Sequence, residues 1–307
     1  MRLLLLSLIL GIFTCTAQTN KIEFTGTALD LAGDTIYLKK YAHFDYLDDD
    51  FILDWVIVDE EGNFQLEMND PGAGLVLVSP YSNEPPSYQI LRRSPHIYYY
   101  TMCEKFFGRN PTIYVESGKD YQVDHWDQKN KEPSVKFADE KQQKLRSYYR
   151  DINYRGLVSD KNRKLLDLPA KEAWSRIEQE RDMRLSLLDL DQSFPVQSFE
   201  HYMKTEITLG AVNEFLIWYN NKTDGSIEND LYRNLMDLYT TEEWNPHSMA
   251  YYKLTERFIN YHLNLRYGKT ENYFAPSEEK LEIAQEFAGK NIREKYVSNI
   301  NRSLRQM

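Results

Sequence analysis

The spacing of apolar residues changes once along this chain, and that change limits the folds open to it. Up to about residue 126, apolar and polar residues alternate in short runs, whereas from Val135 onward apolar residues recur every three or four positions. A period of two is typical of half-buried strands, and a period of 3.6 is typical of amphipathic helices. The sequence therefore predicts an α+β protein, with an antiparallel β-sandwich or small barrel in residues 18–130 and an α-helical array in residues 131–307.

The clearest strand signal lies at residues 52–68, where two apolar-alternating runs flank an acidic turn at residues 59–63. The turn contains a glycine, which readily adopts the positive φ of a tight turn. We therefore expect an antiparallel hairpin that buries Phe64, Leu66 and Met68 on one face. Further strands are predicted at residues 21–26, 35–40, 74–78, 111–115 and 120–124. Because each of these strands hides only one face, two sheets must stack.

Three apolar stripes at helical spacing run through the second half of the chain. They are Trp174, Ile177, Arg181, Leu185 and Leu188; Phe199, Met203, Ile207, Ala211 and Phe215; and Tyr251, Leu254, Phe258, Tyr261 and Leu265. Pro169 suits a first helical turn, Ser248 suits a cap, and Ser277 suits the start of a final helix. Such stripes are typical of helix-on-helix cores rather than cofactor sites.

The N-terminus has the pattern of a secretory signal peptide. Arg2 is followed by an almost unbroken apolar run at residues 3–13 and then by small residues, which predicts cleavage between Ala17 and Gln18. The apolar run is shorter than the roughly 20 residues that a membrane helix needs. We therefore expect a signal peptide at residues 1–17 and an exported protein, periplasmic or associated with the cell envelope.

A competing interpretation makes Cys15 a lipid-modified anchor. Phe13 and Thr14 argue against it, because lipoprotein signals prefer small residues at those positions. We favour the form without the lipid.

The net charge of −10 argues against nucleic acid as a partner, because phosphates are bound by lysine and arginine patches. No stretch after the N-terminal run is long and apolar enough for a transmembrane helix. The expected partner is an unidentified envelope protein or a small ligand.

Residues 81–110 interrupt the strand pattern with loop chemistry and a dense group of aromatic residues. Insertions on rigid sheets often carry binding surfaces, and tyrosine and arginine are common at recognition hot spots. Arg92, Arg93, Tyr98 and Tyr100 are therefore a candidate recognition surface. The simpler interpretation is a β-extension whose aromatic side chains pack on the sheets, and we favour it.

We identify no catalytic, cofactor-binding or metal-binding residues in the sequence. The six histidines are scattered, and the acidic run at residues 45–54 lacks the glycine of a calcium loop. Nucleophile-elbow, phosphate-loop and dinucleotide-binding motifs are absent from the sequence. After export only Cys103 remains, without a Cys-x-x-Cys pair. Burial as a small apolar residue is favoured for it over a reactive thiol.

The order of segments resembles a known family. The chain contains, in this order, the segments "KIEFTGTALDLAGDTIYL", "VIVDEEGNFQLEM" and "TIYVESGKDYQV". A Tyr-rich helical part follows them. This order is similar to the N-terminal region of exported TlpA-like thiol–disulfide oxidoreductases of the Bacteroidetes type. The resemblance implies a small β module and a helical region, which in the family precede a C-terminal thioredoxin domain with a Trp-Cys-x-x-Cys-type site. This sequence has no such site, so no catalytic residue can be carried over. We expect a relative without the redox domain, or a truncated or split gene product.

These observations favour a non-enzymatic exported protein that serves as a binding or interaction module. The alternative is an accessory part of a thiol–disulfide exchange system whose thioredoxin domain is missing or encoded separately. That alternative predicts a reactive Cys103.

Overall fold

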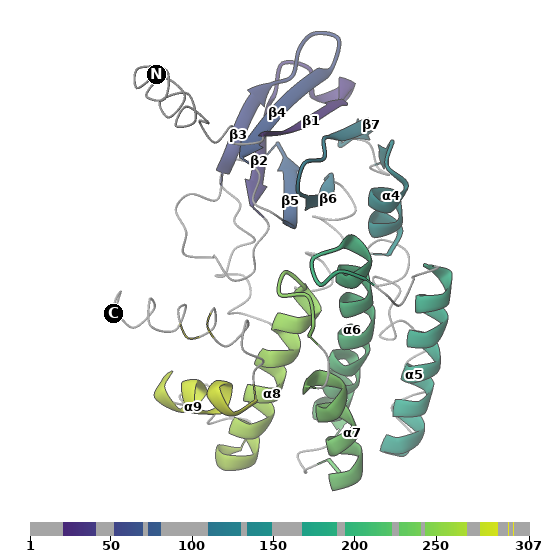
Figure 1. The fold of residues 1–307 in the computed structure, drawn as a ribbon, viewed down its shortest axis with the longest axis vertical. Helices are drawn as coiled ribbons and strands as arrows, with labels where there is room; N and C mark the ends of the chain where they lie inside the picture. The colour runs from purple at the N-terminus through teal and green to yellow at the C-terminus, as the bar shows by residue number, and fades with distance from the viewer. Residues whose placement is uncertain are drawn as a thin grey trace, which may run out of the picture.

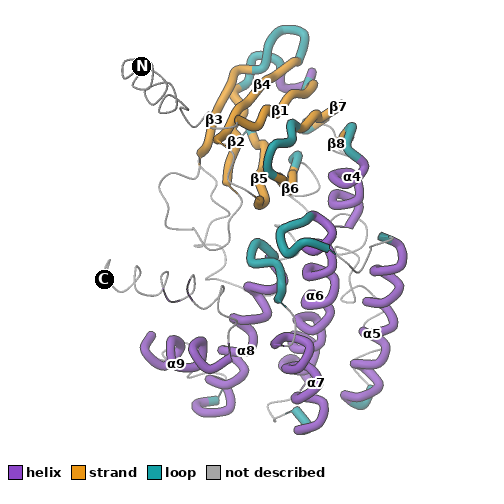
Figure 2. The backbone as a smooth tube through the Cα atoms, in the orientation of Figure 1, coloured by secondary structure: helices purple, strands orange, loops and turns teal. Residues whose placement is uncertain are grey.

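A computed structural model of the chain describes residues 21–40, 52–69, 73–80, 110–129, 134–148, 168–188, 194–222, 227–240, 243–268 and 277–287, together with residues 294 and 297. Its strands are β1 (Lys21–Thr27), β2 (Thr35–Lys40), β3 (Ile52–Ile57), β4 (Asn63–Asn69), β5 (Ala73–Ser79), β6 (Thr112–Glu116), β7 (Tyr121–Asp127) and β8 (Ser134–Phe137), with the 3₁₀-helix η1 (Leu29–Leu31) after β1. The helices are α4 (Glu140–Ser147), α5 (Ala170–Leu187), α6 (Phe199–Lys222), α7 (Asn229–Thr240), α8 (Met249–Tyr267) and α9 (Ser277–Phe287). Strands occupy the upper part of the view and helices the lower part (Figures 1 and 2), so the predicted α+β class is confirmed.

The strands form two four-stranded sheets, which together are here called the two-sheet unit. Sheet A has the order β4-β1-β7-β8 and sheet B the order β3-β2-β5-β6. Neighbouring strands are antiparallel except for β1 and β7, which run parallel with Phe24 opposite Tyr121. The predicted antiparallel pairing therefore holds apart from this pair. Val135 lies in β8, so the strands continue beyond the residue at which the helical period was placed.

The hairpin predicted at residues 52–68 is wrong. β3 belongs to sheet B and β4 to sheet A, so the turn between them connects the two sheets. The expected burial is confirmed, because Phe64, Leu66 and Met68 are buried while Asn63 and Gln65 are exposed. Alternation identifies the buried face of a strand, but the partner in the sheet is decided by long-range pairing.

The turn between β3 and β4 is fixed by its own hydrogen bonds and by a contact with the start of η1. The Asp59 carboxylate accepts from the Asn63 N–H at 2.6 Å, and the Gly62 carbonyl accepts from the Ala28 N–H at 2.7 Å. Gly62 has φ +84°, and a Cβ added to it would lie 2.6 Å from the Cα of Leu29. Glycine is therefore required here both by backbone conformation and by close approach.

A Gly62→Ala substitution is expected to lower the free energy of unfolding by about 2 kcal/mol, through positive-φ strain and overpacking. Gly118→Ala is the matched control, because Gly118 has φ +73° and no atom within 4 Å of an added Cβ. The control should lose only about 1 kcal/mol, from backbone strain alone. Urea denaturation measures both, and equal losses would show that the approach to Leu29 has no energetic effect.

One apolar core lies between the sheets. Sheet A contributes Phe24 and Trp126, and sheet B contributes Leu38 and Val78, all of them fully buried. Burial of these faces is the main stabilising contribution to the two-sheet unit.

The helices begin and pack largely as their sequence predicts. Pro169 immediately precedes α5, and the Ser248 hydroxyl accepts from the Tyr251 N–H at 3.1 Å to cap α8. All five stripe residues predicted on α6 are buried. Leu265 is the exception on α8, because it lies near the C-terminal end of the helix and is exposed. Among the described helices, none combines the length and apolarity needed to cross a membrane.

The helices cover part of the outer face of sheet B. Leu75, Leu77 and Tyr114 point away from the core between the sheets and are buried in a second cluster with Tyr148, which follows α4, and with Tyr202 of α6. The turn between β3 and β4 lies at the opposite, upper end of the two-sheet unit (Figure 1). The fold therefore has a junction with the helices and a far end that lies away from them.

Candidate functional site

The recognition surface proposed from the sequence, Arg92, Arg93, Tyr98 and Tyr100, lies outside the described residues, as do Ala17, Gln18 and Cys15. Cys103, on which the thiol-exchange alternative depends, also lies outside them. These assignments stay predictions.

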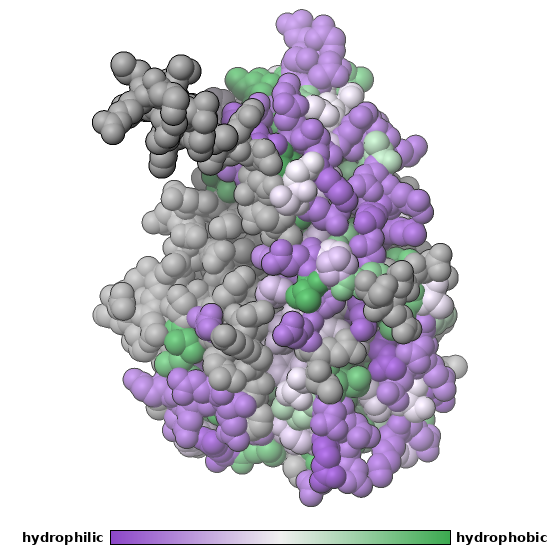
Figure 3. All heavy atoms as spheres, in the orientation of Figure 1, coloured by the Kyte–Doolittle hydropathy of each residue, from purple (hydrophilic) through white to green (hydrophobic). Residues whose placement is uncertain are grey.

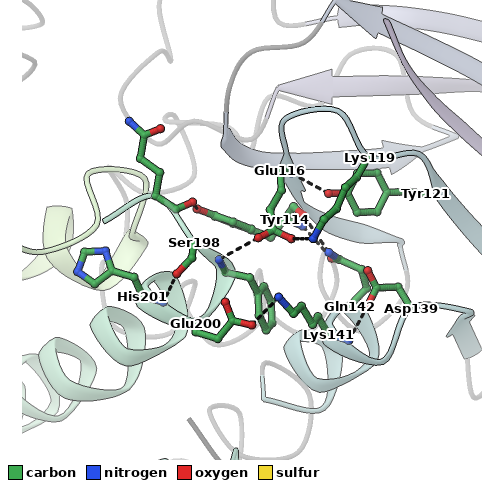
Figure 4. Close-up of polar contacts among 12 residues, drawn as sticks. Tyr114, Glu116, Lys119, Tyr121, Asp139, Lys141, Gln142, Ser198, Glu200 and His201 are labelled. Atoms are coloured by element: carbon green, nitrogen blue, oxygen red, sulfur yellow. Dashed lines mark hydrogen bonds and ion pairs between the residues drawn. The ribbon is translucent and has the colours of Figure 1, made fainter. Parts of the chain in front are cut away.

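A polar network joins sheet B to the N-terminal end of α6 (Figure 4). The Tyr114 hydroxyl donates to the Gln197 carbonyl at 2.9 Å and accepts from the Asn245 side-chain amide at 3.2 Å. The Gln142 side chain accepts from the Tyr114 N–H at 2.9 Å and donates to its carbonyl at 2.8 Å. Burial raises the pKa of the Tyr114 hydroxyl, which therefore stays protonated. Tyr114 is the centre of this junction.

Charged side chains at the same junction are paired with one another. The Glu116 carboxylate accepts from the Phe199 N–H at 3.4 Å, where a negative charge favours the helix N-terminus, and it also pairs with Lys119. Lys141 pairs with Glu200 (Figure 4). Because these groups already hold partners, the junction positions α6 on sheet B, and we assign it a structural role.

Two titratable pairs link helices to each other. The Tyr232 hydroxyl lies 2.7 Å from Nε2 of His262, and burial lowers the pKa of His262. A carboxylate oxygen of Glu214 lies 3.7 Å from the Arg184 guanidinium, and burial raises the pKa of Glu214 to about 7. Neither pair lines the hollows described below. The described residues also contain no group of three or more His, Cys, Asp or Glu side chains placed to hold a metal ion.

A hollow of about 460 Å³ lies near η1, and it is here called the η1 hollow. It is lined by Leu31, Asp34, Thr35, Tyr37, Pro80, Gln128 and Lys129. The Asp30 carboxylate holds two of these lining residues in place, because one oxygen accepts from the Gln128 N–H at 2.7 Å and from the Lys129 N–H at 2.6 Å. The space-filling view shows mainly hydrophilic residues over the upper end of the molecule (Figure 3).

One residue that lines the η1 hollow has a buried oxygen without a hydrogen-bond partner among the described residues. It is Gln128, which is only 6% exposed and whose Oε1 has no donor. Oδ1 of Asp30, which does not line the hollow, also has no partner among the described residues. A buried acceptor without a donor costs about 1–3 kcal/mol, so such groups point to a missing partner. The neighbouring Lys129 ammonium is instead paired with Asp34 at 2.7 Å. The η1 hollow is therefore lined by one residue with an unsatisfied acceptor and by the ion pair of Lys129 with Asp34.

An aromatic surface adjoins the η1 hollow. Tyr37 lines the hollow and lies directly opposite Trp55 on the neighbouring strand, so both side chains lie on the outer face of sheet B. Trp55 is 60% exposed. Large exposed aromatic side chains beside a polar hollow are typical of small-ligand sites.

A second hollow of about 620 Å³ is lined by residues of β1, β3, β4 and β7, among them Thr25, Ile57 and Gln122. None of its described lining residues has a buried side-chain oxygen or nitrogen without a partner. The smaller η1 hollow is therefore the better candidate for a binding site. A buried polar atom without a hydrogen-bond partner is stronger evidence for a missing ligand than the volume of a hollow is.

Comparison of the chain with protein-family models, with curated proteins and with solved structures finds no match. The resemblance to thiol–disulfide oxidoreductases therefore stays a prediction. The sequence did not identify Gln128, Asp30 or Tyr37 as residues of a candidate site. For their neighbour Trp55, one sequence signal could have indicated an exposed apolar side chain. The run at residues 55–58 is apolar at every position, so it places apolar side chains on both faces of a strand.

Proposed function

We propose that this protein is an exported, non-enzymatic module of the cell envelope that binds a small ligand without changing it. In this proposal the two-sheet unit is a β-sandwich that carries the binding site, and the helical array that follows it is the support. The N-terminal signal pattern supports export, and the paired charges of the junction support a structural role for the helical contact.

The observation that carries the proposal is the buried, unpartnered Oε1 of Gln128 at the η1 hollow. A ligand that donates a hydrogen bond to this oxygen would offset the cost of its burial. Lys129 and Asp34 beside it form an ion pair with each other at 2.7 Å. Because each group is engaged by the other, the pair favours positioning a ligand over transferring a proton to it.

The test is a ligand-observed saturation-transfer experiment with a library of small hydroxyl-, amide- and amine-bearing compounds. We expect a subset to bind the wild-type protein, because their donors satisfy Gln128, and to lose binding in the Gln128→Leu variant. Gln65→Leu is the control, because Gln65 is exposed on β4 and does not line the η1 hollow.

Binding that survives Gln128→Leu would place the ligand elsewhere, and the absence of any bound compound would contradict a small-ligand module. Mass spectrometry of the recovered compounds should show them unchanged. A chemically altered compound would contradict the non-enzymatic assignment.

A further inference from the structure

We infer that the η1 hollow binds a neutral carbohydrate, an inference that rests on the proposed binding function. A ligand in the η1 hollow lies beside a buried acceptor. Oε1 of Gln128 has no partner among the described residues, so the ligand must offer a hydrogen-bond donor to this oxygen. A sugar ring carries several hydroxyl groups on neighbouring carbons, each of which can donate one hydrogen bond.

The charges that line the η1 hollow cancel. Among its lining residues, Asp34 contributes one negative charge and Lys129 one positive charge, and the two are paired at 2.7 Å. A charged ligand would have to compete with this ion pair, so a neutral ligand fits best. The hydroxyls of a neutral sugar can also donate to Asp34 and accept from Lys129.

The aromatic surface favours a ligand with an apolar face. Tyr37 and Trp55 lie side by side on the outer face of sheet B, and Lys39 Nζ lies 5.8 Å from the Tyr37 ring centroid. Trp55 presents a largely exposed ring next to the η1 hollow. A pyranose has a face of C–H groups as well as a rim of hydroxyls, so one face can stack on an aromatic ring while the rim makes hydrogen bonds. The volume of about 460 Å³ also lies within the range of about 300–1,000 Å³ found for small-ligand sites.

The experiment compares three matched sets of probes by isothermal titration calorimetry and ligand-observed NMR. The sets are neutral glucose oligosaccharides of several linkages, cationic glucosamine oligosaccharides and anionic glucuronate oligosaccharides. We expect at least one neutral oligosaccharide to bind more tightly than its charged counterparts. Gln128→Leu and Trp55→Ala should each weaken that binding about tenfold, by loss of a hydrogen bond and of a stacking surface respectively.

Met183→Ala is the control for the aromatic surface, because Met183 is also a largely exposed apolar side chain but lies on α5 and does not line the η1 hollow. It should leave the affinity unchanged. Trp55 is itself largely exposed, so Trp55→Ala is expected to fold even if Gln128→Leu is destabilised.

The results distinguish a wrong ligand class from a wrong proposed function. If library compounds bind in a Gln128-dependent way but no neutral oligosaccharide binds, the carbohydrate class is wrong and the binding module stands. Tighter binding of a charged set, or sugar binding that neither variant weakens, would also overturn the carbohydrate assignment. If neither library compounds nor sugars bind, the proposed function itself fails.

Discussion

Replacement of Tyr114 by alanine is expected to lower the free energy of unfolding by about 4 kcal/mol, the largest loss predicted for this chain. The Tyr114 side chain is fully buried, and its ring centroid lies 4.7 Å from that of Tyr202 and 5.8 Å from that of Phe199. The substitution removes this packing and also leaves the Gln197 carbonyl and the Asn245 amide without the hydroxyl. Guanidinium denaturation followed by circular dichroism measures the loss.

Tyr114→Phe is the matched control, because it keeps the ring and removes only the hydroxyl. We expect it to cost about 1–2 kcal/mol. Amide hydrogen exchange gives the second readout. Tyr114→Ala should speed exchange in β6 and in the first turns of α6 together, since both contact this side chain. A loss below about 1 kcal/mol for the alanine variant would contradict the central place of Tyr114 in the junction.

The parts of the fold that depend on local patterns could be predicted from the sequence. Phe64, Leu66 and Met68 are buried as their alternation indicates, and Ser248 caps α8 because a serine hydroxyl suits a helix N-terminus. The pairing of β3 and β4 could not be predicted in this way. Their turn has hairpin chemistry, yet β4 pairs with the distant strand β1, from Thr27 opposite Asn63 to Lys21 opposite Asn69. Local alternation carries no information about which strand lies next in the sheet.

The candidate site was less predictable than the fold, for the same reason. The η1 hollow is lined by residues far apart in the chain, and beside it the Asp30 carboxylate binds backbone N–H groups that lie 98 and 99 residues further along. No motif links these residues, since each is common as a surface residue taken alone. Their significance comes from burial without a partner, which is a property of the folded protein.

The buried carboxyl of Glu214 is expected to make the free energy of unfolding depend strongly on pH. This residue on α6 lies against Arg184 of α5, whose guanidinium also lies 3.3 Å from Glu180. Oε2 of Glu214 has no hydrogen-bond partner among the described residues. Desolvation outweighs the attraction of Arg184 and raises the pKa of Glu214 from 4.5 to about 7. Burial disfavours the charge of Arg184, but the attraction of Glu214 and other nearby groups outweighs it and raises the pKa of the guanidinium, so Arg184 stays charged.

The sign of the pH dependence follows from proton binding. Between pH 4.5 and about 7 the folded protein holds a proton on Glu214 that the unfolded chain has released. Stability therefore falls as the pH rises through this window, by about 3 kcal/mol in total for a shift of this size. Urea denaturation at pH 5, 6, 7 and 8 measures the slope.

Glu214→Gln should abolish this contribution, because the amide resembles the protonated carboxyl and cannot ionise. The variant should match the wild type near pH 5 and exceed its stability by about 2–3 kcal/mol at pH 8. Glu178→Gln is the control, because Glu178 lies on the same helix beside Arg181 and is not among the groups that shift the pKa of Glu214, so the variant should keep the wild-type slope. A Glu214→Gln variant that is less stable than the wild type at pH 8 would show that the ion pair with Arg184 outweighs desolvation. The ion pair would then be a net stabilising contact between α5 and α6, in addition to the apolar packing of Trp174 against Phe215.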